Sequence, residues 1–75
     1  MYVVKHNIPT KTFLPSHTFS RKKDALHKFR EIEKWCMKMN FPVKSFLRDT
    51  QNKPLRASLK VEVDNFTYYA ELYAQ

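Results

Sequence analysis

The 75-residue sequence contains no glycine, and this absence excludes a whole group of binding sites. Loops that cradle phosphate groups depend on glycine, because their backbone must approach the ligand closely and adopt unusual angles. We therefore expect no nucleotide-binding motif of that kind. Tight turns must be formed by Asn, Asp and Pro instead.

Cysteine and histidine are also scarce. The single cysteine, Cys36, excludes an internal disulfide, and a lone cysteine of this kind is typical of a small buried side chain in a reducing compartment. The three histidines, His6, His17 and His27, do not have the spacing of metal ligands. We expect no metal and no other cofactor.

Long hydrophobic segments are absent too. No apolar run approaches the roughly 18–20 residues that a membrane-spanning helix needs. The first ten residues, "MYVVKHNIPT", lack the charged start, the long apolar stretch and the small-residue cleavage site of a signal peptide. The sequence therefore predicts a soluble, cytoplasmic protein with no membrane-spanning segment.

Acidic residues are few compared with basic ones. Seven Asp and Glu stand against 14 Lys and Arg, which gives a formal net charge of +7 at pH 7. Such a charge affects the choice of partner and the rate of encounter rather than the fold. It leaves three classes of partner open, which are nucleic acid, an acidic protein surface and an anionic membrane.

The length and composition predict one domain, residues 1–75. A hydrophobic content of 43% is ordinary for a globular chain and too high for a disordered one. A domain of this size has a net stability of only about 3–5 kcal/mol. A partner, or self-association into a dimer, would add to that small value.

The first half of the chain reads as a strand, an irregular connection and a helix. Residues 2–7 are β-prone, and residues 9–20 contain two prolines with several Ser and Thr. A helix is predicted over residues 21–39, with Ser20 as its N-cap and Asn40 at its end. Its apolar residues recur at helical spacing, which places on one stripe Ala25, Leu26, Phe29, Ile32, Cys36 and Met39.

The second half reads as a three-stranded meander. The predicted strands cover residues 42–49, 55–63 and 66–74. A polar segment with proline, residues 50–54, joins the first two strands. Asp64 and Asn65 form a two-residue turn between the last two, because both residue types tolerate positive φ angles.

These elements predict a two-layer α+β domain in the order β-α-β-β-β. One helix packs on one face of a mainly antiparallel sheet, because each element must bury its apolar side against another. The position of the first strand is left open. Its connection through the helix would be right-handed if the chain returned parallel in the same sheet.

A two-residue turn fixes which residues face each other across the last hairpin. Leu59 then lies opposite Ala70 on the apolar face, which we expect beneath the helix. On the other face, Lys60 lies opposite Tyr69 and Arg56 opposite Tyr73, as cation–π pairs. Since one helix cannot cover both faces, the uncovered face should carry Lys44, Phe46, Arg48, Arg56, Lys60, Tyr69 and Tyr73, with Glu62 and Glu71 among them.

The helix has a basic stripe of its own. Its spacing of four, three, four and four residues gathers within about 80° Lys23, His27, Arg30, Lys34 and Lys38. Asp24 and Glu31 flank this stripe and reduce its charge. Trp35 lies between the apolar and polar sides, where it either packs at the edge of the core or contacts a partner.

No set of residues indicates catalysis. The few carboxylates have no paired spacing, and no glycine is available for an oxyanion hole beside Ser16, His17 or Ser20. A domain this small rarely encloses the roughly 300–1,000 Å³ of a small-molecule site. We therefore expect a protein that binds a partner and is not an enzyme.

Three binding hypotheses follow. The first is docking on an acidic protein, because Tyr and Arg dominate the binding energy of protein interfaces. The second is direct binding of DNA or RNA, with bases stacked on the aromatic side chains and phosphates held by the cations. The third, a membrane-surface helix, is disfavoured because the apolar side of the helix is needed for the core. We predict as partner-binding residues Lys44, Phe46, Arg48, Arg56, Lys60, Tyr69 and Tyr73 of the sheet and Lys23, Arg30, Lys34 and Lys38 of the helix.

The whole chain, Lys-rich, without glycine and beginning at Met1, resembles the small early proteins with which phages disable host machinery. Within it, "QNKPLR", from Gln51 to Arg56, is similar to the Gln-then-Leu peptide carried by partners of sliding clamps, although Arg56 stands where an aromatic or aliphatic residue is usual. The same stretch also reads as a turn leading into a strand. The resemblance implies an inhibitor of a host protein of DNA replication or other nucleic-acid metabolism, such as a sliding clamp.

Overall fold

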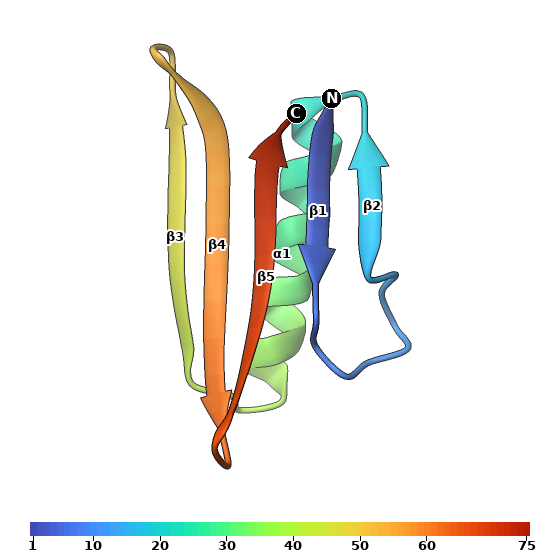
Figure 1. The fold of residues 1–75 in the computed structure, drawn as a ribbon, viewed down its shortest axis with the longest axis vertical. Coiled ribbons are helices and arrows are strands. Elements are labelled where there is room, and N and C mark those ends of the chain that lie inside the picture. The colour runs from blue at the N-terminus through green and yellow to red at the C-terminus, as the bar shows by residue number, and fades with distance from the viewer.

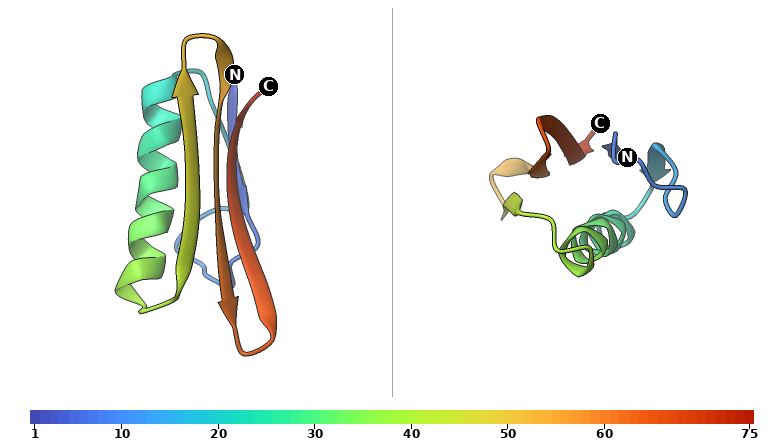
Figure 2. Two further views of the ribbon diagram at one scale, coloured as in Figure 1. Left: turned by 90° about the vertical axis from the view of Figure 1, so that its left-hand side faces the viewer. Right: turned by 90° about the horizontal axis from the view of Figure 1, so that it is seen from below.

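A computed structural model describes residues 1–75 as one sheet and one helix. Along the chain the elements are β1 (Tyr2–His6), β2 (Ser16–Phe19), α1 (Lys22–Lys38), β3 (Val43–Thr50), β4 (Lys53–Val63) and β5 (Phe66–Ala74). The strands form a single five-stranded sheet in the order β2-β1-β5-β4-β3, and every neighbouring pair is antiparallel. α1 covers one face of this sheet (Figures 1 and 2). The predicted two-layer α+β fold is confirmed.

The segment predicted as an irregular connection, residues 9–20, contains a short strand. β2 pairs with β1 from Tyr2 opposite Phe19 to Lys5 opposite Ser16. Four residues are too few to show an alternating pattern, so the pairing with β1 is what makes them a strand. β1 itself lies between β2 and β5 and runs antiparallel to both, which settles the position that the sequence left open.

The start of α1 differs from the prediction in its cap. The helix begins at Lys22, so Arg21 occupies the N-cap position, and its side chain makes no capping hydrogen bond. Ser20 is one residue too early to satisfy the first N–H groups, and the prediction of a serine cap is wrong. Asp24 in the first turn supplies negative charge where the helix dipole favours it.

The end of α1 is confirmed. Asn40 adopts a positive φ of 61°. Its N–H donates to the carbonyl of Met37 at 3.0 Å, and the N–H of Phe41 donates to that of Cys36 at 3.1 Å. These two bonds form a Schellman motif, which normally uses glycine at the position of Asn40.

The turn between β4 and β5 also behaves as predicted. Asp64 and Asn65 have φ angles of 49° and 69°, as a two-residue turn of type I′ requires. The resulting register sets Leu59 opposite Ala70 and Lys60 opposite Tyr69. Since neighbouring residues of a strand point to opposite faces, the turn decides which side chains α1 covers.

The hydrophobic core lies between α1 and the sheet face that it covers, here called the inner face. Its twelve buried residues come from the helix, the sheet and the segment after β1: Val4, Ile8, Ala25, Phe29, Ile32, Cys36, Leu55, Ala57, Leu59, Val61, Ala70 and Leu72. Burial raises the pKa of the Cys36 thiol, and nearby Glu33 adds to this effect. Met39, predicted on the apolar stripe, is exposed because the helix ends before it.

Trp35 packs at the edge of the core, as one of the two sequence readings predicted. Its ring meets Phe13 at 6.5 Å and Phe41 at 6.0 Å between centroids, both edge to face. These contacts tie the connection between β1 and β2 to the far end of α1.

The helix is too short and too polar to cross a membrane.

Candidate interaction surface

The uncovered side of the sheet, here called the outer face, carries the residues predicted for it. Leu59 and Val61 of β4 are buried beneath the helix, so Lys60 between them points outward. The pairing of β3 with β4 puts Ser45 opposite Leu59 and Phe46 opposite Ser58, which sets the sidedness of β3. The structure thus brings together Lys44, Phe46, Arg48, Arg56, Lys60, Tyr69 and Tyr73, with Glu62 and Glu71.

Two pairs of like charges face each other across β3 and β4. Lys44 lies opposite Lys60, and Arg48 lies opposite Arg56. Like charges directly opposite one another destabilise a sheet. The two pairs are four residues apart along β3, which corresponds to about 13 Å. The register of β3 against β4 was not predicted, so these pairs could not be read from the sequence.

An aromatic residue lies between the two cation pairs. Phe46 is opposite the small Ser58, and its side chain is 52% exposed. Tyr69, opposite Lys60, is 39% exposed. An open, shallow hollow of about 400 Å³ lies between these side chains, lined by Lys44, Ser45, Phe46, Ser58, Leu59, Lys60, Thr67, Tyr69, Ala70 and Glu71. The hollow can receive a side chain or a base, and cations border it.

Carboxylates neutralise only a part of this charge. Lys60 Nζ lies 3.1 Å from Glu62 Oε1. This hydrogen bond, followed by the charges of Lys60 and Lys44, holds the pKa of Glu62 below its ordinary value of 4.5. Arg56 is exposed and has no acidic partner within ion-pair distance. The outer face therefore keeps an excess of positive charge.

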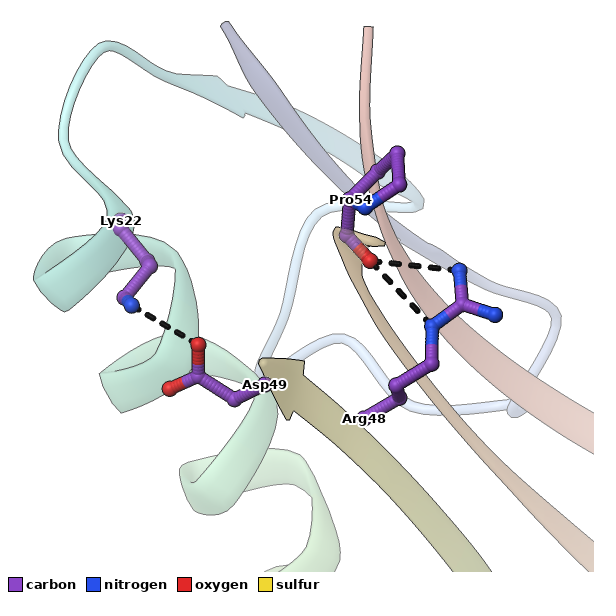
Figure 3. A network of polar contacts seen from close by, with 4 residues as sticks. All are labelled: Lys22, Arg48, Asp49 and Pro54. Carbon is purple, nitrogen blue, oxygen red and sulfur yellow. Dashed lines mark hydrogen bonds and ion pairs between the residues drawn. The ribbon is translucent and has the colours of Figure 1, made fainter. Parts of the chain in front are cut away.

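Arg48 has a structural role as well. Its Nε and Nη2 atoms donate to the carbonyl of Pro54 at 3.4 and 3.2 Å, across the turn from β3 to β4 (Figure 3). Next to it, Asp49 Oδ1 accepts from Lys22 Nζ at 2.8 Å. This bond and the charge of Asp49 raise the pKa of Lys22. Adjacent residues of β3 thus connect its end to β4 and to α1.

The cation–π pairs differ from those expected. The ammonium of Lys5, on β1, lies 5.4 Å from the ring centroid of Tyr73, while Lys60 turns to Glu62 instead of Tyr69. Tyr73 is half-buried next to Val3, which is buried although it points to the outer face. β1 pairs with β5, and this pairing places both Lys5 and Val3 beside Tyr73. Lys5 joins the outer face, and only the unpredicted pairing of β1 with β5 could have identified it.

The basic stripe of the helix forms a separate surface. A hollow of about 670 Å³ is lined by Lys23, Asp24, Leu26, His27, Arg30 and Lys34. Arg30 bonds Glu33 at 3.1 Å, and His27 lies 2.9 Å from Glu31. α1 lies on the inner side of the sheet (Figure 2). The stripe, including Lys38 at the helix end, lies opposite the buried residues of α1 around the helix, so it is directed away from the sheet. The two predicted basic groups are not brought together.

The stretch that resembles a clamp-binding peptide is part of the fold. Gln51 and Asn52 form the turn, and the remaining residues begin β4. Leu55, the hydrophobic anchor of the resemblance, is buried in the core. The reading as a turn leading into a strand is confirmed, and the motif lies in a position where a clamp cannot reach its leucine.

No group of three or more His, Cys, Asp or Glu side chains lies close enough together to hold a metal ion. Compared with models of known protein families, with characterised proteins and with solved structures, the chain matches none of them. The outer face is therefore interpreted from its own geometry and charge.

Proposed function

We propose that this protein is a small binding module that docks through the outer face onto an acidic surface of another protein. The observation that supports this most directly is the arrangement of Lys44 opposite Lys60 and Arg48 opposite Arg56 around the exposed Phe46. Two like-charge pairs lower the stability of a domain whose net stability is already small. The carboxylates of an acidic partner would attract all four cations and offset the repulsion between them.

The aromatic residues add apolar contact area to the basic surface, as at protein interfaces. Phe46 and Tyr69 offer apolar area beside the cations, and such residues together with Arg are enriched at the centre of protein interfaces. Binding alone, with no chemical step, is the activity that we propose. On the resemblance to phage proteins, the partner is an acidic host protein of DNA replication or other nucleic-acid metabolism, and the site of action is the host cytoplasm.

Direct binding of single-stranded nucleic acid is a second candidate. The same exposed Phe46 and Tyr69 could stack on bases, while the flanking cations contact phosphates. Glu62 and Glu71 lie within the outer face and would repel a phosphate backbone. An acidic protein can place its carboxylates away from these two residues, so we favour a protein partner.

A comparison of two charge-matched triple variants tests the proposal. The first replaces Lys44, Arg56 and Lys60 of the outer face with Ser, and the second replaces Lys23, Lys34 and Lys38 of the helix with Ser. Each variant loses three positive charges, and all six residues are exposed. Binding to poly-L-glutamate and to an oligothymidine is measured by fluorescence anisotropy at ~50 and ~200 mM salt, because counterion release makes nucleic-acid binding fall by orders of magnitude over this range.

We expect the outer-face variant to lose at least about tenfold in affinity for poly-L-glutamate, and the helix variant to stay close to wild type. Equal losses in both variants would mean that net charge alone determines binding and would refute the outer face as the site. Tight, steeply salt-dependent binding of oligothymidine together with weak binding of poly-L-glutamate would establish the second candidate instead.

A further inference from the structure

The two edges of the sheet are unequal. β2 has four residues, whereas β3 has eight. β3 is the last strand of the sheet and pairs with β4 alone (Figure 1). Alternate residues of an antiparallel edge strand direct their N–H and C=O groups away from the sheet. β3 therefore presents a row of unpaired backbone groups, which can template a further strand.

Several of the usual protections of an edge strand are missing from β3, although Asp49 and Lys22 place an ion pair near its end. The strand contains no proline, and its irregularity is confined to the end, between Arg48 and Thr50. It is also longer than the edge strands that proteins keep short to prevent pairing. Charge remains as the main protection, because Lys44 and Arg48 project to the outer side of the edge.

Contacts of α1 identify the helix flank that turns toward β3. Lys22 Nζ bonds Asp49 near the end of β3, at 2.8 Å (Figure 3). Lys28 and Trp35 instead contact Phe13, in the connection between β1 and β2. The side of the helix that carries Lys22 is thus the side of β3, and the opposite side belongs to β2.

Apolar side chains lie along this flank and are covered only in part. At 100° per residue, Leu26 and Met37 fall within about 60° of Lys22 around the helix. Met37 is 61% exposed. Leu47, on the inner side of β3, is 41% exposed, although Ala57, its partner on β4, is buried. The edge of β3 is therefore bordered by cations on its outer side, and on its inner side by Leu47 and Met37 before the Lys22–Asp49 ion pair.

We infer that β3 is a docking edge for an extended segment of the partner, which joins the sheet as a sixth strand. Side chains of a strand alternate between two faces, so the segment would place acidic residues toward Lys44 and Arg48 and apolar residues toward Leu47 and Met37. This inference rests on the proposed function. It names the acidic partner as an extended peptide whose acidic and apolar residues alternate.

Charge also distinguishes this partner from a second copy of the chain. A copy that pairs antiparallel through its own β3 brings another Lys44 and Arg48 to the same outer side. In the register centred on Phe46, each Lys44 would lie opposite an Arg48 of the copy. Each chain also carries a net charge of +7. Lys44 and Arg48 would repel a second copy of β3 and attract an acidic strand. The same two residues therefore favour an acidic peptide over a second copy of the chain.

Designed peptides test this inference. The probe is acetyl-(Glu-Val)₄-amide, whose eight residues match the length of β3, and the control is acetyl-Glu₄-Val₄-amide, which has the same composition without the alternation. NMR titration of the full chain reports which backbone amides respond. We expect the alternating peptide to bind about tenfold more tightly than the control, with the largest shifts on residues 43–50. Methylation of alternate peptide nitrogens, in the phase that faces β3, should abolish binding, and the other phase should preserve it.

A matched pair of variants sharpens the test. Leu47→Asp adds an inward charge to the edge of β3, and Leu14→Asp adds the same charge to an exposed leucine in the connection between β1 and β2. Leu47→Asp should weaken binding of the alternating peptide about tenfold, while Leu14→Asp leaves it within about twofold of wild type. Both leucines are exposed, so both variants should fold.

The outcomes separate this inference from the proposed function. If the two peptides bind equally and Leu47→Asp has no effect, while the outer-face triple variant still loses binding, strand addition is wrong and the proposed function stands. If neither peptide nor poly-L-glutamate binds, both fail. A concentration-dependent dimer that Leu47→Asp abolishes would show that a second copy occupies the edge. Binding of oligothymidine alone would overturn the inference in favour of nucleic acid.

Discussion

Successive residues of β4 and β5 point alternately to the inner and the outer face, and the two sets affect stability in opposite ways. On the inner face, Leu59, Val61 and Leu72 are buried against the helix. On the outer face, Lys60 lies next to Lys44, and Arg56 lies next to Arg48. The first arrangement stabilises the fold, and the second lowers its stability. We propose that the chain keeps these two like-charge pairs because the outer face binds a partner.

The largest expected effect comes from the inner face. Leu59→Ala should lower the free energy of unfolding by about 2–5 kcal/mol, through lost burial and the cavity left behind. The whole stability of a domain this small is about 3–5 kcal/mol, so we expect the variant to be largely unfolded. Urea denaturation followed by circular dichroism measures the loss. Lys60→Ala, the adjacent residue on the other face, is the control and should change stability far less.

The turn between the strands should have the next largest effect, because it assigns residues to faces. Asn65 has a φ of 69°, which a β-branched side chain tolerates poorly. Asn65→Val should therefore cost about 1–2 kcal/mol of stability. Asn65→Gly, which relieves the same constraint, should be at least as stable as wild type. If Val were as stable as Gly at this position, the turn would not be the element that fixes the register.

On the outer face, one change should move stability and binding in opposite directions. Arg56→Glu converts the pair with Arg48 from repulsive to attractive, and should raise stability by about 0.2–1 kcal/mol, because Arg56 has no acidic partner to lose. The same change should weaken binding of poly-L-glutamate. Thermal unfolding and anisotropy measure the two effects. Lys11→Glu, an exposed lysine in the connection between β1 and β2 with the same change in charge but no strand partner, is the control and should give no comparable gain in stability.

How much the sequence predicts depends on how local each feature is. The helix, predicted over 21–39 and found at Lys22–Lys38, and the turn at Asp64 and Asn65 follow from patterns within a few residues. The sidedness of β4 and β5 follows in turn from that hairpin, so the outer-face residues on these strands were placed correctly. Local patterns therefore predicted most of the candidate surface.

The features that were missed depend on contacts between distant segments. β2 is a strand because it pairs with β1, and four residues carry no pattern of their own. Lys5 joins the outer face because β1 lies beside β5, some 70 residues away at its first pairs. The like-charge pairs arise from the register of β3 against β4. The connection predicted over residues 50–54 was too long, because Thr50 pairs with Lys53 and only Gln51 and Asn52 form the turn. All three features depend on the three-dimensional arrangement of the strands and could not be predicted from local sequence patterns.

The smallest expected effect concerns the one carboxylate that bonds a lysine of the like-charge pairs. Glu62 accepts a hydrogen bond from Lys60, with Lys44 nearby, and its pKa in the folded protein is lowered from 4.5. Its contribution to stability is therefore present above pH 4.5 and is lost as the pH falls through the lowered pKa. NMR titration of the Glu62 side chain should show a midpoint below 4.5 in the wild type. Lys60→Met should move that midpoint upward more than Lys44→Met, because Lys60 supplies both the hydrogen bond and the nearer charge. Equal shifts in the two variants would mean that Lys44 and Lys60 contribute equally to the pKa of Glu62. The ion pair between Lys60 and Glu62 would then not be the dominant interaction of this carboxylate.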